Sequence, residues 1–225
     1  MEDYAIHLKA KALSVLAHIF MKIASFSDSH WQYMNIKSFP KADILLFAGD
    51  WSGRGEESEA YDFCKWFSEL PYKIKIAVPG NHERFVNYFP KDIKKLFADN
   101  NIQLLIDESV SIENINIYGT PYCPLFGDGY WAFLESETEL YNRFLKIPDN
   151  TNILLTHCPP HNILDNGYGS VALKEVLKKK HINYHIFGHI HESFGNTVIK
   201  DTKYYNVSVL DEDYLLKNPI TVFEV

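Results

Sequence analysis

The sequence is poor in cysteine and contains no long apolar run. Its three cysteines, Cys64, Cys123 and Cys158, form no CxxC pair and leave an odd one, which argues against a disulfide framework. That usage favours a reducing compartment, and we expect a cytoplasmic protein. No apolar stretch approaches the roughly 20 residues that a membrane-spanning helix needs, so we expect no membrane partner.

An excess of positive charge is also absent, since the 225 residues carry a formal net charge of −7. Proteins that hold nucleic acid stably usually present a basic face, because neutralising the backbone phosphates drives that binding. The dense basic runs, 91–95 and 178–180, are typical of solvated helix faces. We therefore expect no stable nucleic-acid binding, and any phosphate substrate must be attracted locally.

No internal repeat or low-complexity linker divides the chain, which predicts one domain over residues 21–225. Residues 1–20 are interpreted as an N-terminal extension, either an appended amphipathic helix or a segment upstream of a natural start at Met21. A signal peptide is the alternative, because Ala12–Phe20 is apolar and follows two lysines. Acidic residues at the start, the shortness of the apolar run and the lack of a clean cleavage site count against it.

Hydrophobic periodicity predicts strands that alternate with helices, which indicates the α/β class. The expected strands cover residues 22–26, 43–47, 73–78, 152–156 and 184–187, with short strands within 103–118 that break at Glu113-Asn114. The expected helices cover residues 56–70, 92–99, 135–145 and 170–180. Residues 119–131 are expected to form a long aromatic loop, and residues 193–225 to form hairpins.

Polar residues follow several of these strands at the point where each strand ends. They are Asp28, Asp50, Asn81, His157 and His189. Ligand sites of open α/β sheets gather at the carboxyl ends of strands, so five separate segments can converge at one edge. The side chains offer oxygen and imidazole nitrogen without thiolate, which suits Mn²⁺, Fe, Zn²⁺ or Mg²⁺ rather than a closed cysteine-type zinc site.

The motifs around these residues occur in a fixed order: D-S-H at 28–30, G-D at 49–50, G-N-H-E at 80–83, a lone His157, and G-H-I-H at 188–191. This order resembles the calcineurin-like metallophosphoesterase superfamily over nearly the whole chain. Further stretches resemble a narrower branch, the metallophosphoesterase-domain-containing (fetal-brain-type) phosphodiesterases. They are LPYK at 70–73, IYGTP at 117–121, THCPP at 156–160, FGHIHE at 187–192 and NPITVF at 218–223.

The resemblance implies a layered α/β/β/α sandwich of two mixed sheets flanked by helices, and two divalent metal ions. Mn²⁺ is favoured, with Fe, Zn²⁺, Ni²⁺, Co²⁺ or Mg²⁺ as alternatives. The resemblance gives one metal the ligands Asp28, His30 and His191, gives the other Asn81, His157 and His189, and makes Asp50 the bridge. It also implies that His82 and Asn81 contact the substrate, and that Glu83 supports His82 or a ligand from behind.

Elementary chemistry is consistent with these roles. Two cations about 3.5–4 Å apart lower the pKa of a shared water and clamp the phosphoryl oxygens, and a bridging carboxylate such as Asp50 holds them together. The leaving oxygen needs an acid, and imidazole is the side chain that titrates near neutrality. The implied reaction is attack by a metal-bridging hydroxide with His82 as acid. Gly53 replaces the tyrosine ligand of purple acid phosphatases, which excludes that subtype.

The expected substrate is a phosphodiester, in particular a small nucleotide such as a cyclic nucleotide. Alternatives are a phosphomonoesterase or protein phosphatase, a nuclease, and a non-catalytic scaffold. Arg54 follows Asp50 and either binds a substrate phosphate or lies in water. The aromatic loop either stacks a nucleobase or packs in the core, through Tyr122, Phe126, Tyr130 and Trp131. The sequence leaves the oligomeric state open.

The remaining chemistry-bearing side chains have a structural interpretation. Cys158 adjoins His157 but has no base of its own, which favours a buried inert thiol over a nucleophile. The other histidines are expected to be structural, with His161 the least typical because it lies four residues beyond a candidate ligand. They are His7, His18, His161, His181 and His185.

Overall fold

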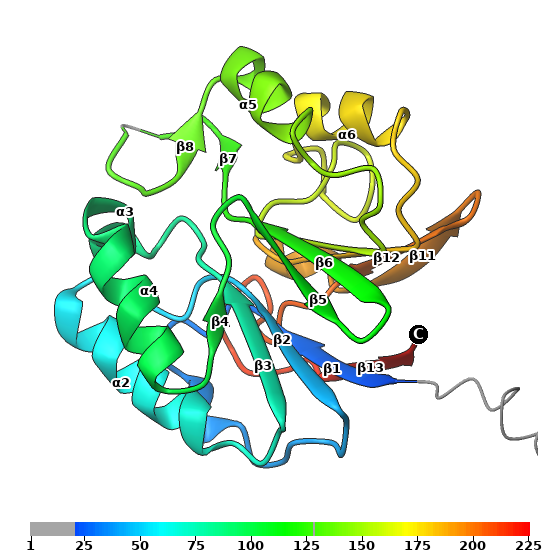
Figure 1. Ribbon diagram of the computed structural model, residues 1–225. Helices are drawn as coiled ribbons and strands as arrows, with labels where there is room; N and C mark the ends of the chain where they lie inside the picture. The colour runs from blue at the N-terminus through cyan, green and yellow to red at the C-terminus, as the bar shows by residue number, and fades with distance from the viewer. Residues whose placement is uncertain (1–20, 128) are drawn as a thin grey trace, which may run out of the picture.

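The computed structural model describes residues 21–127 and 129–225, and the expected N-terminal extension lies outside the described residues. Figure 1 shows two β-sheets packed against each other, with helices on both outer faces. One sheet has the strand order β13-β1-β2-β3-β4 and the other β11-β12-β10-β9-β6-β5. Both combine parallel and antiparallel pairs, so the predicted layered α/β/β/α sandwich of two mixed sheets is confirmed.

The first sheet is parallel except at one edge. Its strands are β1 (Lys22–Phe26), β2 (Ile44–Ala48), β3 (Ile74–Val78), β4 (Gln103–Leu104) and β13 (Thr221–Glu224). Strands β1 to β4 run parallel, and β13 pairs antiparallel with β1, with Ile23 opposite Phe223. The last strand, β13, thus lies in the same sheet as the first described strand, β1.

The second sheet contains a parallel centre with a hairpin at each edge. Its strands are β5 (Glu108–Ile112), β6 (Ile115–Thr120), β9 (Ile153–Thr156), β10 (Tyr184–Phe187), β11 (Gly195–Ile199) and β12 (Thr202–Asn206). The turn between β5 and β6 falls at the predicted Glu113-Asn114 break. A separate pair, β7 (Cys123–Pro124) and β8 (Leu134–Glu135), lies within and after the expected aromatic loop.

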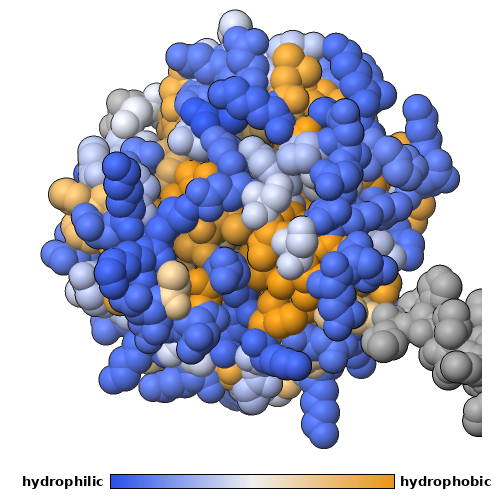
Figure 2. Space-filling view, viewed as in Figure 1, coloured by the Kyte–Doolittle hydropathy of each residue, from blue (hydrophilic) through white to orange (hydrophobic). Residues whose placement is uncertain are grey.

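Strand β2 shows why the core forms two layers. All five residues of its sequence ILLFA are buried, as expected for a strand covered on both faces. Because side chains alternate along a strand, Leu45 and Phe47 face the helices while Ile44, Leu46 and Ala48 face the other sheet. Figure 2 shows hydrophilic residues over most of one molecular face, with apolar atoms concentrated where the layers meet.

The helices cover the outer faces. On the first sheet lie α2 (Glu57–Glu69), α3 (Arg84–Tyr88) and α4 (Pro90–Asp99); on the second lie α5 (Glu137–Phe144) and α6 (Val171–Leu177). Helix α2 begins with a capping box between Glu56 and Glu59 and buries Phe63 and Phe67 against the sheet. Short 3-10 turns follow the site motifs at η1 (Tyr33–Asn35) and η2 (His191–Ser193). No helix in the described ranges is long and apolar enough to cross a membrane.

Two expectations about elements were wrong. Helix α3 was not predicted, because a five-residue helix is too short to show helical periodicity. The tail was expected to form hairpins throughout, and β11 and β12 do so, but β13 pairs with β1 instead. Local pattern carries no information about a partner that lies some 200 residues earlier in the chain.

Candidate metal centre

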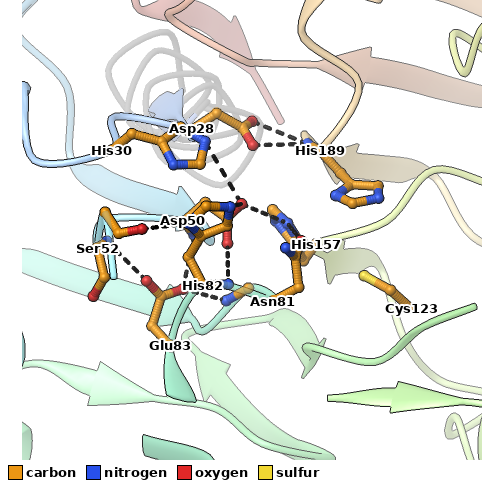
Figure 3. A network of polar contacts seen from close by, with 12 residues as sticks. Asp28, His30, Asp50, Ser52, Asn81, His82, Glu83, Cys123, His157 and His189 are labelled. Carbon is orange, nitrogen blue, oxygen red and sulfur yellow. Dashed lines mark hydrogen bonds and ion pairs between the residues drawn. The ribbon is translucent and has the colours of Figure 1, made fainter. Parts of the chain in front are cut away.

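The carboxyl ends of β1, β2, β3, β9 and β10 meet at one edge of the molecule, although the strands belong to two sheets. Figure 3 shows side chains from these strand ends pointing toward one another. All seven candidate ligands lie in this region. They are Asp28, His30, Asp50, Asn81, His157, His189 and His191.

Asp50 is the centre of the arrangement. Its carboxylate Oδ2 lies 3.3 Å from His157 Nε2 and 3.7 Å from His30 Nε2. Its Oδ1 accepts a 2.9 Å hydrogen bond from the backbone N–H of His82. The carboxylate is buried and stands between the two groups of side chains that the resemblance assigns to different metals.

The first group is Asp28, His30 and His191. One ligand atom from each lies within 4.8 Å of the other two. The Nε2 atoms of His30 and His191 are 3.2 Å apart, and His191 Nε2 is 3.5 Å from Asp28 Oδ1. His191 Nδ1 lies 3.2 Å from the carbonyl of Asp211, which can only accept, so Nδ1 carries the proton and Nε2 offers its lone pair to the group.

The second group is Asn81, His157 and His189. His157 Nδ1 donates to the carbonyl of Ala48 at 2.8 Å, which leaves Nε2 as an acceptor 2.9 Å from Asn81 Oδ1. Two acceptors facing each other at that distance need a cation or proton between them. The His189 ring lies 4.9 Å from that of His157, and its backbone N–H donates to Asp28 at 3.0 Å.

The left-handed backbone conformation of four residues directs their side chains toward the site. Asp28, His30, Asp50 and His189 all have positive φ, at 53°, 39°, 63° and 70°. Such left-handed residues are uncommon outside glycine, cost free energy, and concentrate at functional sites. Here each one follows the end of a strand and redirects the chain so that its side chain faces the shared edge.

Two glycines make the close approach of these segments possible. A Cβ atom at Gly188 would collide with the Asp28 carboxylate and with Ser27 Oγ, and one at Gly80 would collide with Asp50 Oδ1. Glycine is therefore required by the space beside the carboxylates rather than by turn geometry.

The electrostatics of the cluster follow from burial and proximity. Burial alone would raise the pKa of Asp50, but the neighbouring His157, His82 and His30 hold it well below its usual range. Burial would lower the pKa of His157, yet the Asp50 carboxylate raises it to about 10. Burial and then His157 lower the pKa of His189 to about 3. In the protein without cations, a proton on His157 neutralises part of the carboxylate charge.

Glu83 supports the site by accepting hydrogen bonds from backbone N–H groups rather than from the side chains of candidate ligands. Its buried carboxylate accepts hydrogen bonds from the backbone N–H groups of Gly80 at 2.5 Å, Asp50 at 2.9 Å and Ser52 at 2.9 Å. Burial and then the charge of Asp50 raise its pKa to about 8, while the three N–H groups act in the opposite direction. Glu83 thus fastens the Asp50 loop to the loop that carries Asn81.

His82 lies close to the candidate ligands, and one atom each of His82, His30 and Asp50 lie within 4.8 Å of one another. Its Nδ1 donates to the carbonyl of Gly53 at 2.9 Å, and its Nε2 is 3.9 Å from Asp50 Oδ2. Arg54, one residue beyond Gly53, is exposed, and no ion pair joins its guanidinium to another residue in the described part of the chain. Its side chain is available to a substrate.

Some residues of the aromatic loop pack in the core and others lie against histidines of the site. Tyr122 packs in the core against Phe133 and under the guanidinium of Arg143. Phe126 lies 5.4 Å from the His189 ring, and Trp131 lies 4.1 Å from the His82 ring. Tyr130 is half-exposed and contacts Arg84.

Cys123 is a residue near the site that the sequence pattern did not indicate. Its Sγ lies within 4.8 Å of ring nitrogens of His157 and His189 (Figure 3). Nothing in the motif order marks it, because it sits in the strand β7 that local pattern did not predict. Cys158 is buried and donates to the carbonyl of Tyr122 at 3.3 Å, as expected of an inert thiol.

Of the remaining histidines, the three in the described part of the chain belong to none of the groups that could hold a metal. His185 is buried, its Nε2 is 2.9 Å from Thr156 Oγ1, and burial lowers its pKa to about 3. His161 Nδ1 lies 3.6 Å from Asp165 Oδ2, and His181 is exposed. His7 and His18 lie outside the described residues.

The donor set fits divalent cations. Oxygen and imidazole nitrogen atoms from separate strands converge, and two carboxylates supply the negative charge. The lone pairs of two ligands, His157 and His191, are directed inward because their Nδ1 atoms donate to backbone carbonyls. The candidate ligands include no cysteine thiolate, so the site suits borderline and hard cations.

Comparison with known proteins agrees with this geometry. Residues 21–193 match the calcineurin-like phosphoesterase family model. The chain is 32% identical to human metallophosphoesterase domain-containing protein 1, over 92% of this chain and 71% of that protein. It is 31% identical to UPF0046 protein T07D4.2 of Caenorhabditis elegans, over 88% of this chain and 58% of that protein.

A solved structure shares the fold. The protein TT1561 of Thermus thermophilus superposes with a TM-score of 0.63 at 14% identity, over 83% of this chain and 88% of that one. Taken with the family match, the convergent carboxylates and imidazoles identify this chain as a member of the calcineurin-like phosphoesterase family, a family of metal-dependent phosphoesterases.

Proposed function

We propose that this protein is a phosphodiesterase that uses two divalent metal ions to hydrolyse a small nucleotide, such as a cyclic nucleotide. The observation that carries the proposal is the position of Asp50, whose carboxylate lies 3.3 Å from a nitrogen of one group and 3.7 Å from a nitrogen of the other. A carboxylate between two sets of donors is the arrangement that a pair of cations requires.

The proposed ligands divide as the resemblance to the family assigns them. One cation takes Asp28, His30 and His191, the other takes Asn81, His157 and His189, and Asp50 serves both. When bound, two cations withdraw charge from phosphoryl oxygens and lower the pKa of water. Manganese is the favoured metal, and Fe, Zn²⁺, Ni²⁺, Co²⁺ and Mg²⁺ suit the same donors.

His82 is proposed to protonate the leaving group. Hydrolysis forms a bond from a water oxygen to phosphorus and breaks the bond from phosphorus to the leaving oxygen. The proton on His82 Nε2 passes to that oxygen, and the proton that the water loses reaches solvent and later restores the imidazolium. The hydrogen bond from Nδ1 to Gly53 keeps Nε2 as the atom that faces Asp50 and the substrate.

Substrate contacts complete the proposal. Arg54 follows Gly53 and is exposed, so its guanidinium can bind a phosphate bidentately. Asn81, whose Oδ1 lies 2.9 Å from His157 Nε2, is the second proposed substrate contact. The preference for a diester rests on the resemblance to the phosphodiesterase branch. A phosphomonoester, including a phosphoprotein, is the second candidate, because the same residues would serve both reactions.

The cytoplasm is proposed as the compartment. Cys64, Cys123 and Cys158 are all free thiols and all buried, a state that a reducing environment preserves. Fractionation of cells that express the full chain tests this point, and recovery of the protein in secreted medium would contradict it.

The test of the proposed activity begins with protein stripped of metal and reloaded with Mn²⁺. We expect about two ions per chain, a higher kcat/KM for bis(p-nitrophenyl) phosphate than for p-nitrophenyl phosphate, and turnover of at least one cyclic nucleotide in a panel. Asp50→Asn should lose both metal and activity. His82→Ala should keep metal while losing turnover of the cyclic nucleotide, whose alkoxide leaving group needs a proton. A strong monoester preference would refute the diester assignment, and full turnover of the cyclic nucleotide in both variants would refute the mechanism.

A further inference from the structure

Residues 130–132 lie against residues 81–84, the segment that carries Asn81 and His82. At one end the backbone N–H of Ala132 donates to the carbonyl of Asn81 at 2.8 Å. At the other end Arg84 Nη1 donates to the Tyr130 hydroxyl at 2.7 Å, and the Arg84 guanidinium lies 3.8 Å from the centre of the Tyr130 ring. A hydrogen bond and a cation–π contact therefore fix this loop to the site on both sides of Trp131.

Between these two attachments Trp131 contacts His82 directly. The ring centroids are 4.1 Å apart and the planes are inclined by 33°, the geometry of a tilted stack. Within residues 21–127 and 129–225, His82 has one other ring neighbour, His30, whose plane meets it at 77° with centroids 4.3 Å apart. Trp131 is half-buried, so its indole also covers one side of the imidazole from solvent.

Hydrogen bonding alone does not fix the imidazole. Among the described residues its side chain makes one close hydrogen bond, from Nδ1 to the Gly53 carbonyl at 2.9 Å, while Nε2 is 3.9 Å from Asp50 Oδ2. The ring can still rock about the axis of that bond on the side that the His30 contact leaves open. A flat indole packed on the ring removes that motion and holds Nε2 in one direction.

We propose that Trp131 is a positioning residue that holds the imidazole of His82 in the orientation needed to protonate the leaving oxygen. This inference rests on the proposed role of His82 as the acid. Among the described residues, the ring contacts of Trp131 are with His82 and Tyr130, and neither of these is a candidate metal ligand. In this role Trp131 acts on the step that consumes the proton.

Because Trp131 acts only on the protonation step, its loss should change the dependence of the rate on the leaving group, which loss of a merely structural tryptophan would not do. A leaving group such as p-nitrophenolate departs without a proton, whereas a poor one such as phenolate or an alkoxide needs it. Loss of His82 orientation should therefore slow poor leaving groups and spare good ones. A general loss of structure or of metal would slow both equally.

The experiment uses the full chain loaded with Mn²⁺ and a series of aryl methyl phosphates whose leaving groups range from p-nitrophenol to phenol. For Trp131→Ala we expect kcat on the phenyl ester to fall by on the order of tenfold or more, with the p-nitrophenyl ester within about twofold of the unmodified protein. KM should change little for either ester. Trp131→Phe keeps a flat ring and should restore most of the lost rate.

Two comparison variants separate the possible outcomes. His82→Ala should show the same selective loss in a stronger form, and adding Trp131→Ala to it should change little further. Tyr61→Ala removes a half-exposed aromatic side chain from helix α2 and should leave the series unchanged. Metal content and circular dichroism are measured for every variant, and Trp131→Leu gives a second reading of the series if Trp131→Ala does not fold.

If His82→Ala slows all esters equally, the proposed acid is wrong, and the inference about Trp131 falls with it. If His82→Ala is selective while Trp131→Ala and Trp131→Leu slow good and poor leaving groups alike, or slow neither, the positioning role is refuted and the proposed function stands.

Discussion

Glu83 offers the sharpest test of how the site is supported. Its Oε2 accepts from the backbone N–H groups of Asp50 and Gly80, and its Oε1 accepts from that of Ser52. The change to examine is Glu83→Gln, which keeps the size of the side chain. Burial and then the charge of Asp50 raise the pKa of Glu83 to about 8. Cations beside Asp50 would offset the second of these causes, so the comparison is made with metal-loaded protein.

The expected magnitude follows from counting acceptors. The glutamine amide has one oxygen and one NH₂ group, and the NH₂ group cannot accept from a backbone N–H. At least one of the three buried N–H groups is therefore left without a partner, which costs about 1–3 kcal/mol of stability. Because the same bonds hold the loop of Asp50, we also expect metal affinity to fall by about 10–100-fold.

Urea unfolding measures the free energy, and competition with a chromophoric chelator measures metal affinity. Glu59→Gln is the matched control, since its carboxylate also accepts from backbone N–H groups, those of Gly53, Arg54 and Glu56. It should lose similar stability but keep metal affinity, because the residues whose N–H groups it binds include no candidate ligand, whereas Glu83 binds the N–H of Asp50 itself. If Glu83→Gln binds metal as tightly as the unmodified protein, the supporting role assigned to Glu83 is wrong.

Three further outcomes are expected. Gly188→Ala places a methyl group against the Asp28 carboxylate. This change should lower the free energy of unfolding by about 1–3 kcal/mol and weaken metal binding. Unchanged metal affinity would show that Asp28 can shift without loss. Arg54→Ala should raise KM by on the order of tenfold with kcat nearly unchanged, and steady-state kinetics that show the reverse would contradict a binding role. Metal-free protein should lose stability as pH rises from about 6.5 toward 10. The folded pKa of His157, about 10, exceeds its unfolded value, so its contribution is complete below 6.5 and disappears as it loses its proton. Thermal unfolding across that range checks the sign, and a flat profile would refute it.

The sequence predicted much of the architecture because buried strands and helices have recognisable hydrophobic patterns over short stretches of sequence. Strands β1 and β10 begin and end where their apolar runs do, and helix α2 lies within one residue of its expected limits. The site was also accessible from sequence, since residues that directly follow buried strands must lie at a sheet edge. The ligand roles themselves remain predictions that metal binding will test.

Other features have no recognisable pattern in the neighbouring sequence. Helix α3 is a single short turn of structure, and β13 pairs with a strand some 200 residues away. Cys123 lies beside His157 and His189 only because β7 folds back toward the second sheet. Contacts of this kind depend on how loops pack after the sheets have formed, and no residue spacing encodes them.

The sequence by itself determined the fold class, the family and the group of side chains at the strand ends, because periodicity and motif order are properties of the linear chain. Only the tertiary structure decided how that group is held. It placed Asp50 between two sets of donors, directed Glu83 to three backbone N–H groups rather than to a ligand side chain, and laid Trp131 on His82. The physical reason is that orientation is set by contacts between segments that are distant in sequence, and those contacts exist only once the two sheets have packed together.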